Sequence, residues 1–520
     1  MFTYDYPAQD TKIREDDKPL LADSLKPAGE VVMHDEKARR IQLRRGKKAG
    51  ALPRTLSLIP SGPIDTRTIK DAIFRVAEAA CAGSGEYRAA RALVAKAAPR
   101  LFGGRLLAGL AGEPLTRAVE AVQALDESYL VIQGPPGAGK TYTSARAIVA
   151  LLQAGKRVGV ASNSHKAVNK LLEEVEAVAL SKGFPFRGIK KSSKESQFFS
   201  GVYVGNTTDN ADVAGQELIA GTAWLFSRAD LDRTLDYLFV DEAGQVSLAN
   251  VVAMGTSARN IVLVGDQAQL GQPIKGTHPG ESGSSALEYV LREHATVPDD
   301  LGIFLPASRR MHPAVCGFIS EAFYDGRLDA AAGNERQGIV MGSGAHAAIK
   351  ASGISFVDVE HTGCGQQSEQ EAAVVNWLVD SLLEQDWTDR EGNRRRLTLD
   401  DILVVTPYNM QVACLEGTLP AGARIGTVDK FQGQEAPVVI VSMTTSSGEE
   451  MPRDHEFLFS RNRLNVAISR AQGLAIVVAS PRLLAVPCKT IGQMKLVNAL
   501  CKAKAYAQRV DDGSGAQRAA

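Results

Sequence analysis

Closely spaced cysteines are missing from the sequence. Its six cysteines lie far apart, without a Cys-x-x-Cys pair: Cys81, Cys316, Cys364, Cys414, Cys488 and Cys501. Disulfide frameworks, zinc sites and iron–sulfur clusters need clustered cysteines, so this spacing argues against all three. Scattered cysteines are typical of a reducing compartment, and we expect the protein to be cytoplasmic.

Long apolar runs and an excess of one charge are also missing. No segment approaches the ~20 uninterrupted apolar residues of a membrane span, and the amino terminus shows no basic-then-apolar signal pattern,. We therefore expect neither a membrane segment nor secretion. The 59 basic residues equal the 59 acidic ones, which excludes the uniformly basic surface of a strong passive DNA-binding protein.

The amino-terminal part of the chain differs from the rest. With 520 residues the chain is too long for one domain,. Short apolar runs followed by helical periodicity predict, for residues 1–125, an accessory region of short strands followed by helices. The expected strands are Val31–Met33, Ile41–Leu43 and Leu56–Ile59, and the expected helices are Asp65–Ala80 and Tyr87–Ala98. The densest basic run, Lys37–Lys48, lies among these strands.

From residue 126 onward apolar strands alternate with helical segments, which indicates parallel sheets covered by helices on both faces. The first series of strands is Tyr129–Gln133, Val158–Ala161, Leu218–Ala220, Tyr237–Val240 and Ile261–Val264. The second is Ile354–Val359, Ile402–Thr406, Arg424–Thr427, Val438–Met443 and Leu474–Ala479. We predict an α/β fold with two lobes, 126–300 and 301–505, and a disordered tail, 506–520.

A phosphate-binding loop is predicted between the first strand and the helix that follows it. The segment Gly134-Pro135-Pro136-Gly137-Ala138-Gly139-Lys140-Thr141 matches the G-x-x-x-x-G-K-[ST] pattern,. Lys140 would pair with the β- and γ-phosphates, and the Thr141 hydroxyl would ligate Mg²⁺. The alternative is a glycine-rich turn without a ligand, and the strand–loop–helix context argues against it.

A pair of carboxylates after another buried strand completes the requirements of phosphoryl transfer. Asp241 and Glu242 follow the run Tyr237–Val240. Asp241 suits the Mg²⁺ shell, and Glu242 suits orienting or deprotonating the attacking water. An Asp-Glu pair at a solvated strand end is common, but its occurrence after a P-loop indicates a nucleoside triphosphatase.

Further motifs follow in a fixed order. They are ASNSHKAVN (Ala161–Asn169), GTAW (Gly221–Trp224), DEAGQ (Asp241–Gln245), GDQAQL (Gly265–Leu270), RMHP (Arg310–Pro313), TPYNMQ (Thr406–Gln411), TVDKFQGQE (Thr427–Glu435) and RLNVAISRA (Arg463–Ala471). With the P-loop, this series resembles superfamily 1 helicases of the up-frameshift-type branch (subgroup B) over about residues 126–480. The stretch from DEAGQ to Gly283 is similar to the helicase half of bacterial proteins with a RecB-like nuclease.

The resemblance implies two RecA-like lobes that hydrolyse ATP with Mg²⁺ and move 5′→3′ along a strand. It implies that Gln269 senses the γ-phosphate or the attacking water, and that Arg310 and Arg470 are arginine fingers. Such a finger is worth ~10³–10⁵ in rate. Gln411 and Glu435 would contact the nucleotide or its ribose across the cleft.

Nucleic-acid contacts are implied on both lobes. In the first lobe they are Ser162, Asn163 and the turn from Thr222 to Trp224; in the second they are Thr406, Pro407 and Thr427. Small hydroxyl and amide groups suit contacts to phosphate and sugar. Trp224 either stacks a base or belongs to the core. We expect single-stranded DNA as the partner, with RNA possible, and a monomeric protein.

The chain departs from the family pattern in three places. The glutamine that usually reads adenine well before the P-loop is missing, since Gln123 lies too near the loop. Arg309 replaces an aromatic residue and either stacks on the base or faces solvent. Residues 1–125 are too few for the nuclease of the fused relatives, so a separate nuclease subunit is a possible partner. In this branch a small β-barrel and a helical stalk precede the P-loop, so the resemblance implies a β-hairpin or barrel remnant and a helical stalk in residues 1–125. The basic run Lys37–Lys48 then either covers a nucleic-acid channel or is a solvated hairpin.

Three functions remain open at this point. The first is an active 5′→3′ helicase, supported by the motif series. The second is a nucleic-acid-stimulated ATPase that acts as a binding or remodelling module without unwinding, and the neutral net charge favours it. The third is the motor part of a split nuclease–helicase.

Overall fold

The computed structural model describes residues 1–511 apart from short gaps. Residues 8, 10, 12, 37, 47–48, 62–64, 272–277, 293, 343–344, 432, 453–454 and 512–520 lie outside the described part. Both ends of the predicted basic run, Lys37 and Lys47–Lys48, fall on these residues, as does most of the predicted tail. The chain divides into two compact units, Met1–Thr66 and Arg67–Ala520.

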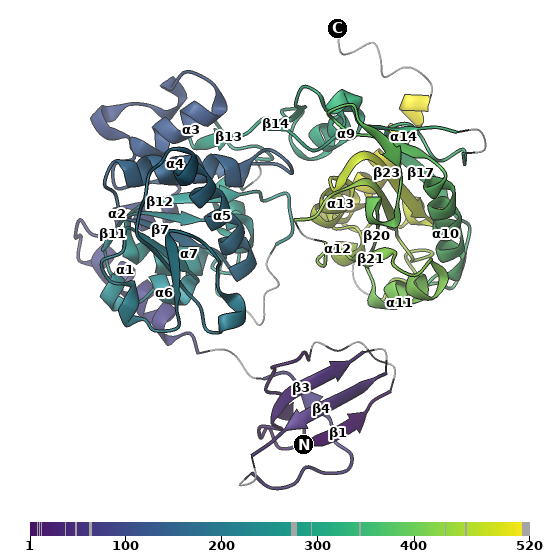
Figure 1. The fold of residues 1–520 in the computed structure, drawn as a ribbon, viewed down its shortest axis with the longest axis horizontal. Coiled ribbons are helices and arrows are strands. Elements are labelled where there is room, and N and C mark those ends of the chain that lie inside the picture. The colour runs from purple at the N-terminus through teal and green to yellow at the C-terminus, as the bar shows by residue number, and fades with distance from the viewer. Residues whose placement is uncertain are drawn as a thin grey trace. The chain divides into compact units, whose positions relative to one another are not determined.

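Unit 1 (Met1–Thr66) is built on an antiparallel sheet with the strand order β1–β4–β3 (Figure 1). Its strands are β1 (Phe2–Asp5), β3 (Glu30–Asp35) and β4 (Arg40–Arg44), and β2 (Leu20–Leu21) pairs separately with β5 (Leu58–Ile59). Val31, Ile41 and Leu43 contribute to a small core of its own. The strands expected in this region are confirmed.

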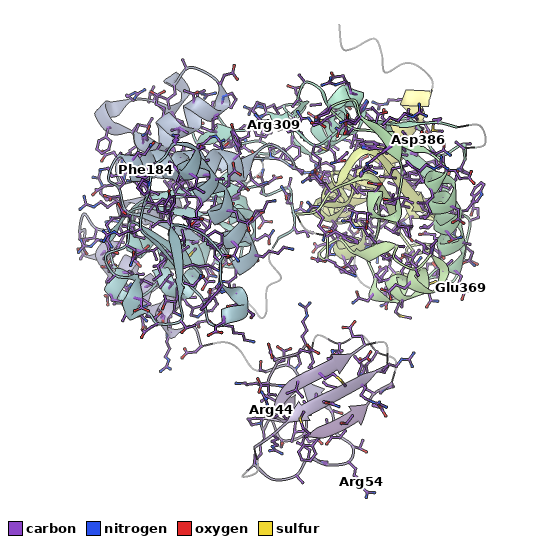
Figure 2. The ribbon with its side chains drawn as sticks, viewed as in Figure 1. Arg44, Arg54, Phe184, Arg309, Glu369 and Asp386 are labelled. Carbon is purple, nitrogen blue, oxygen red and sulfur yellow. The ribbon has the colours of Figure 1, made fainter. Side chains whose placement is uncertain are left out.

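Arginines of β4 alternate with its core residues and are paired across the sheet. The strand register sets Arg40 opposite Asp5 and Arg44 opposite Glu30, and each arginine forms an ion pair at 2.7 Å (Arg44 is labelled in Figure 2). These two members of the basic run are therefore neutralised inside unit 1.

Lobe 1 (residues 67–304) contains an eight-stranded parallel sheet in the order β13–β6–β12–β11–β7–β10–β8–β9. Its strands are β6 (Tyr129–Gln133), β7 (Val158–Ala161), β8 (Gly188–Lys191), β9 (Val204–Thr207), β10 (Leu218–Gly221), β11 (Leu235–Val240), β12 (Ala258–Gly265) and β13 (Gly302–Phe304). The five predicted strands of this lobe are confirmed; β8, β9 and β13 extend the sheet at its two edges.

Helices cover both faces of this sheet because successive strand residues point to opposite sides. Tyr129 and Val131 of β6 belong to one core cluster, and Leu130 and Ile132 belong to another. The first face is covered by α1 (Arg67–Cys81), α2 (Arg88–Val94), α6 (Ala223–Phe226), α7 (Leu248–Met254) and α8 (Ala286–Leu291). The second face is covered by α3 (Pro114–Gln123), α4 (Lys140–Gln153) and α5 (His165–Ser181).

Lobe 2 (residues 305–511) repeats this plan with a five-stranded parallel sheet in the order β17–β23–β22–β20–β21 (Figure 1). Its strands are β17 (Gly353–Asp358), β20 (Ile402–Thr406), β21 (Arg424–Thr427), β22 (Ala436–Ser442) and β23 (Ala471–Ala479). All five predicted strands of this lobe are confirmed. Together the two lobes confirm the predicted α/β fold with parallel sheets.

The helices of lobe 2 also lie on both faces. Ile402 and Val404 pack with α10 (Glu369–Leu383) and α11 (Asn409–Thr418). The other face holds α9 (Pro313–Phe323), α12 (His455–Leu458), α13 (Arg461–Ile468) and α14 (Ile491–Asp511). Short strands lie outside the main sheet: β14 (Ala307–Ser308) with β15 (Asp329–Ala330), and β16 (Gly338–Val340) with β18 (Asp386–Thr388) and β19 (Arg394–Arg396).

The structure departs from the expected segment boundaries in three places. Helices α1 and α2 bury Ile69, Ala72 and Leu93 in the core of lobe 1, so the predicted accessory region divides after residue 66. Strand β13 lies beside β6, past the expected boundary at residue 300. Helix α14 runs to Asp511, into the expected tail, because Ala503 and Ala507 are buried against lobe 2. Among the described residues, no helix has both the length and the apolar character to cross a membrane.

Candidate active site

The P-loop forms a cradle between β6 and α4. Gly137 and Gly139 have φ angles of 76° and 82°, in the left-handed region that favours glycine. A β-carbon on Gly134 would lie 2.3 Å from Cγ of Lys140, so only glycine allows the loop to fold this tightly over the lysine. The Lys140 ammonium donates to the Gly134 carbonyl at 2.8 Å. These features fit a loop whose backbone N–H groups hold phosphates.

The loop forms one wall of a cavity of about 590 Å³. Side chains of both lobes line it: residues 135–142 of the loop and its helix, one face of α5, Glu242 and Gln269 from lobe 1, and Arg310, Gly433 and Arg470 from lobe 2. A site built from two lobes can open and close as the lobes move.

Two carboxylates follow β11, of which Glu242 lines the cavity and Asp241 does not. Asp241 is buried, and burial together with the neighbouring Glu242 charge raises its pKa to about 7, while the Lys140 charge opposes this shift. A cation would relieve that cost, so Asp241 and Thr141 are the residues that could hold Mg²⁺. Within the described residues no three His, Cys, Asp or Glu side chains converge, so phosphate and water would complete the Mg²⁺ shell. Glu242 adopts a left-handed φ of 54°, a strained conformation for a non-glycine residue.

Two arginines reach the cavity from lobe 2. Arg310 donates to Glu435 Oε2 at 2.6 Å and to the Ser469 carbonyl at 3.1 Å. Arg470 donates to the Gln434 carbonyl at 3.2 Å, and its buried Nε has no hydrogen-bond partner among the described residues. Burial and the charge of Arg310 lower the pKa of Arg470 to about 10. Two neighbouring guanidinium groups, held within one buried wall, are suited to an anion.

Two of the residues expected at the nucleotide contribute differently. Glu435 does not line the cavity; it holds Arg310, and it also accepts from Gln472 at 3.0 Å. Although burial raises the pKa of Glu435, the Arg310 charge and hydrogen bond bring the net pKa below its usual value. Gln411 is fully buried inside lobe 2, where it bonds the backbone of Ser368 and the hydroxyl of Ser442. The structure therefore does not place Gln411 at the cavity.

The residues expected to contact nucleic acid lie at the carboxyl ends of strands. In lobe 1, Ser162 follows β7 and Thr222 follows β10, and these strands are paired with Gly221 opposite Ala161. In lobe 2, Thr406 and Thr427 are direct partners across β20 and β21. The carboxyl edge of a parallel sheet is where α/β proteins bind ligands. Each lobe thus has one pair of small hydroxyl residues at that edge, and one member of each pair, Ser162 and Thr406, is buried.

The exposure of these residues differs. Trp224 is 38% exposed, which leaves its ring partly accessible at the start of α6. Asn163 donates from its amide to the Gln245 carbonyl, in the turn that follows Glu242. Thr406 is buried, with its hydroxyl 3.0 Å from that of Thr444.

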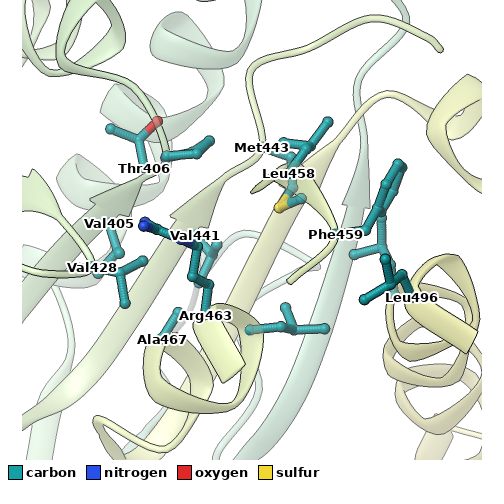
Figure 3. A pocket seen from close by; sticks show the side chains of 13 residues that line it. Val405, Thr406, Val428, Val441, Met443, Leu458, Phe459, Arg463, Ala467 and Leu496 are labelled. Carbon is teal, nitrogen blue, oxygen red and sulfur yellow. The ribbon is translucent and has the colours of Figure 1, made fainter. Parts of the chain in front are cut away.

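Thr406 and Pro407 also line a narrow apolar pocket of about 30 Å³ in lobe 2 (Figure 3). The remaining lining comes mostly from aliphatic and aromatic side chains, among them Val428, Met443 and Phe459. In Figure 3 these side chains stand between the strands and the helices of lobe 2. The volume holds about one water molecule, so the pocket is too small for a nucleobase.

Comparison with known proteins agrees with this arrangement. Two models, each described as an AAA domain, match residues 116–292 and 283–482. The chain is 25% identical over 382 residues to the DNA replication ATP-dependent helicase/nuclease JHS1 of Arabidopsis thaliana, covering 69% of this chain and 27% of that protein. It is 26% identical over 439 residues to the ATP-dependent helicase upf1 of Schizosaccharomyces pombe, covering 70% and 44%. These matches make the chain similar to superfamily 1 helicases.

A solved complex of the Arterivirus nonstructural protein 10 helicase with DNA matches 71% of this chain and 62% of that one, with 15% identity and a TM-score of 0.38. The chain spans 27% and 44% of the length of the two helicase relatives named above. The regions of those relatives outside the match have no counterpart in the alignment.

Some residues at the helicase cavity were not expected from the motifs. Lys170, Glu173, Glu174 and Ala177 of α5 line it, and their i, i+3, i+4, i+7 spacing along one helix face was a usable signal. Tyr142 also lines the cavity, with the guanidinium of Arg146 3.1 Å and that of Arg309 5.2 Å from its ring centre (Arg309 is labelled in Figure 2). Arg309 thus contacts an aromatic ring beside the P-loop, whereas Gln123 is exposed at the end of α3 and does not line the cavity.

Proposed function

We propose that the chain is an ATP-dependent helicase that moves 5′→3′ along single-stranded nucleic acid, with DNA as the favoured strand. The observation that carries this proposal is the convergence of Lys140 and Glu242 from lobe 1 with Arg310 and Arg470 from lobe 2 on one cavity. A binding site that needs both lobes links occupancy of the site to lobe closure.

The roles proposed for the side chains follow from their positions. Bound ATP with Mg²⁺ supplies the phosphoryl bond that is cleaved and the charge to be neutralised. Lys140 and the loop N–H groups hold the phosphates, and Thr141 and Asp241 hold the metal ion. Glu242 takes the proton of the attacking water. The two arginines stabilise charge on the transferred phosphoryl group, an effect worth ~10³–10⁵ in rate for one finger, or roughly 4–7 kcal/mol of barrier.

The strand is proposed to run over the carboxyl edges of both sheets. Ser162, Asn163, Thr222 and Trp224 would hold it on lobe 1, and Thr406, Pro407 and Thr427 on lobe 2. Because Asn163 also donates to the Gln245 carbonyl, a nucleic-acid strand bound to lobe 1 would affect the turn that follows Glu242. This contact offers a direct route by which nucleic acid stimulates hydrolysis.

The test is ATP hydrolysis with and without single-stranded DNA or RNA, followed by unwinding of duplexes with 5′ or 3′ tails. We expect stimulation by single strands and unwinding of 5′-tailed duplexes only. Turnover that is stimulated but never coupled to strand separation would replace the helicase with a remodelling ATPase. A lack of stimulation by either strand would refute both functions.

Two substitutions separate binding from chemistry. Lys140→Ala should abolish ATP hydrolysis and unwinding, since the lysine holds the β- and γ-phosphates. Arg470→Ala should lower kcat by ~10³-fold or more while leaving ATP binding measurable, because a finger acts on the transition state. Fluorescence titration with a labelled ATP analogue measures that binding. Equal loss of binding in both variants would contradict the role proposed for Arg470.

A nuclease partner is proposed on a separate observation. The JHS1 relative is named a helicase/nuclease, and the match covers 27% of it. We propose that the present chain supplies a motor to a nuclease that it does not itself carry within the matched residues, as in the fusions with a RecB-like nuclease. Affinity purification from native extract should recover a nuclease in fixed proportion; recovery of the chain alone as a monomer would refute this partner.

A further inference from the structure

A chain of buried hydrogen bonds crosses from lobe 2 to the loop that carries Gln269. The Tyr324 hydroxyl, at the end of α9, donates to Asp266 Oδ2 at 2.6 Å, and Gln269 Nε2 donates to the same oxygen at 2.8 Å. Asn465 Nδ2, on α13, donates to the Tyr324 oxygen at 3.0 Å and to the Ala268 carbonyl at 2.8 Å. These side chains are all buried, Tyr324 and Asn465 completely.

The Asp266 carboxylate is the final acceptor of this series of hydrogen bonds, and it determines which group donates in each of them. An ionised carboxylate can only accept, so Gln269 must present its NH₂ group to Asp266. Its carbonyl oxygen is then the end left for the cavity, which Gln269 lines. A carbonyl oxygen accepts from water, and a glutamine of this kind orients an attacking water. Asp266 therefore determines which end of the Gln269 amide meets the water.

The ionised state of Asp266 depends on its neighbours. Burial is the largest influence and leaves the pKa of Asp266 above its ordinary value, whereas the Lys140 charge and the hydrogen bonds from Tyr324, Gln269 and the Ala268 N–H oppose that rise. Hydrogen bonds to the charged form of a buried acid stabilise that form. Tyr324 supplies one of these donors from lobe 2, so the acceptor that orients Gln269 is maintained partly by the other lobe.

The same loop is held by a second amide of α13. Asn462 Nδ2 donates to the carbonyls of Gln267 and Gln269, at 3.0 and 2.6 Å. Helix α13 ends just before Arg470, the arginine that reaches the cavity. The helix that positions this arginine thus also bonds the loop that positions Gln269.

We infer that Tyr324 and Asn465 are positioning residues, which orient the Gln269 amide for the attacking water only when lobe 2 is docked on lobe 1. The inference rests on the proposed ATP hydrolysis and adds to it a coupling between lobe closure and water placement. Tyr324 and Asn465 act through Gln269 and do not touch the nucleotide cavity.

Tyr324→Phe tests this inference, since it removes one hydroxyl and keeps the ring. We expect kcat to fall by about 10- to 100-fold, the scale on which a misplaced catalytic group loses rate, with little change in the affinity for a fluorescent ATP analogue. Tyr237→Phe is the matched control, because it also removes a hydroxyl from a buried ring, and the bond that the described residues offer this hydroxyl is a 3.4 Å contact to the Gln123 carbonyl within lobe 1. The control should turn over ATP at the original rate.

A double-mutant cycle distinguishes positioning from mere stability. If Tyr324 acts through Gln269, Tyr324→Phe should lower kcat in the original chain but not in a Gln269→Ala background. Asn465→Ala should behave in the same way. Equal fold-losses in both backgrounds, or no loss from Tyr324→Phe, would overturn the inference while the proposed function stands. No ATP turnover by the unsubstituted chain would overturn the proposed function, and the inference with it.

Discussion

Gly137 lies where the P-loop meets lobe 2, and a side chain at this position would disturb both the loop and lobe 2. Its φ of 76° favours glycine,. A β-carbon here would lie 2.7 Å from Cβ of Arg310 and 2.8 Å from the Ser308 hydroxyl. The Arg309 N–H donates to the Gly137 carbonyl at 2.9 Å, so the backbone just before the RMHP segment and the side chain of Arg310 both lie against this glycine.

Gly137→Ala should therefore lower kcat by about tenfold or more, because displacement of Arg310 misplaces a group that the transition state needs. Gly155→Ala is the matched control: its φ is 70°, and nothing lies within 4 Å of the added carbon. That control should lose about 1 kcal/mol of stability from backbone strain and keep its turnover. Steady-state ATPase assays and thermal unfolding measure both quantities. Similar losses of turnover in the two variants would show that strain alone, and not contact with Arg310, limits the site.

Individual residues also show which parts of the candidate site the sequence motifs predict and which parts they do not. The motifs place Lys140, Glu242, Gln269, Arg310 and Arg470 in segments that the structure brings to one cavity. A motif does not specify which way each side chain turns. Gln411 lies in the first turn of α11 and faces the buried Ser368 and Ser442, an orientation determined by the packing between α10 and β22. Tyr324 and Asn465 were not predicted, since their partners lie 58 and 141 residues away along the chain.

At the scale of elements, continuous apolar runs predicted the central strands because those strands are buried on both faces. Strand β8 was missed for the converse reason. Its sequence is Gly-Ile-Lys-Lys, and it is a strand because β10 and β9 pair with it on either side. Strand β13 has three residues and likewise depends on β6. Such strands depend on pairing with residues far away in the sequence, which a local sequence pattern does not reveal.

Strand β8 also contains a buried cation, which makes stability depend on pH. Lys190 is fully buried, and burial lowers its pKa from 10.5 to about 8; its ammonium donates to the Gln197 carbonyl. Below pH 8 the lysine is charged in both states, so the folded state bears the full cost of burying it. Between pH 8 and 10.5 the folded state releases the proton first, and stability rises with pH by linkage.

Lys190→Met should therefore stabilise the chain at pH 7 by about 1 kcal/mol or more, since moving a polar group from water into the protein interior costs this much when its hydrogen bonds are not fully replaced. The gain over the original chain should shrink as the pH rises above 8, because the original chain then no longer buries a charge. Thermal unfolding at several pH values measures this difference. Lys191→Met, on the half-buried next residue, should show no such trend. A gain that stays constant to pH 10 would contradict the lowered pKa.

At the scale of the whole molecule, the chain consists of a large unit with two lobes and a small unit, Met1–Thr66. Unit 1 has its own core, whereas α1 and α2 belong to the core of lobe 1. The described residues that line the cavity all belong to the second unit. Catalysis should thus require only residues 67–520, and the remaining question is whether the basic run of unit 1 contributes to strand binding.

The charges of unit 1 argue that it contributes little. Arg40 and Arg44 are each bound to a carboxylate at 2.7 Å, and a cation that already has a partner gains less from a phosphate. Deletion of residues 1–66 should therefore keep kcat within about twofold and change the slope of log Kd against log salt by less than about 0.7, the share of one single-strand phosphate contact. Anisotropy titrations of a labelled single strand at several KCl concentrations give that slope. If the deletion made the slope shallower by the share of two or more phosphate contacts, the ion pairs of β4 would have to open in the complex. In that case Asp5→Ala with Glu30→Ala in the full chain should make the slope steeper.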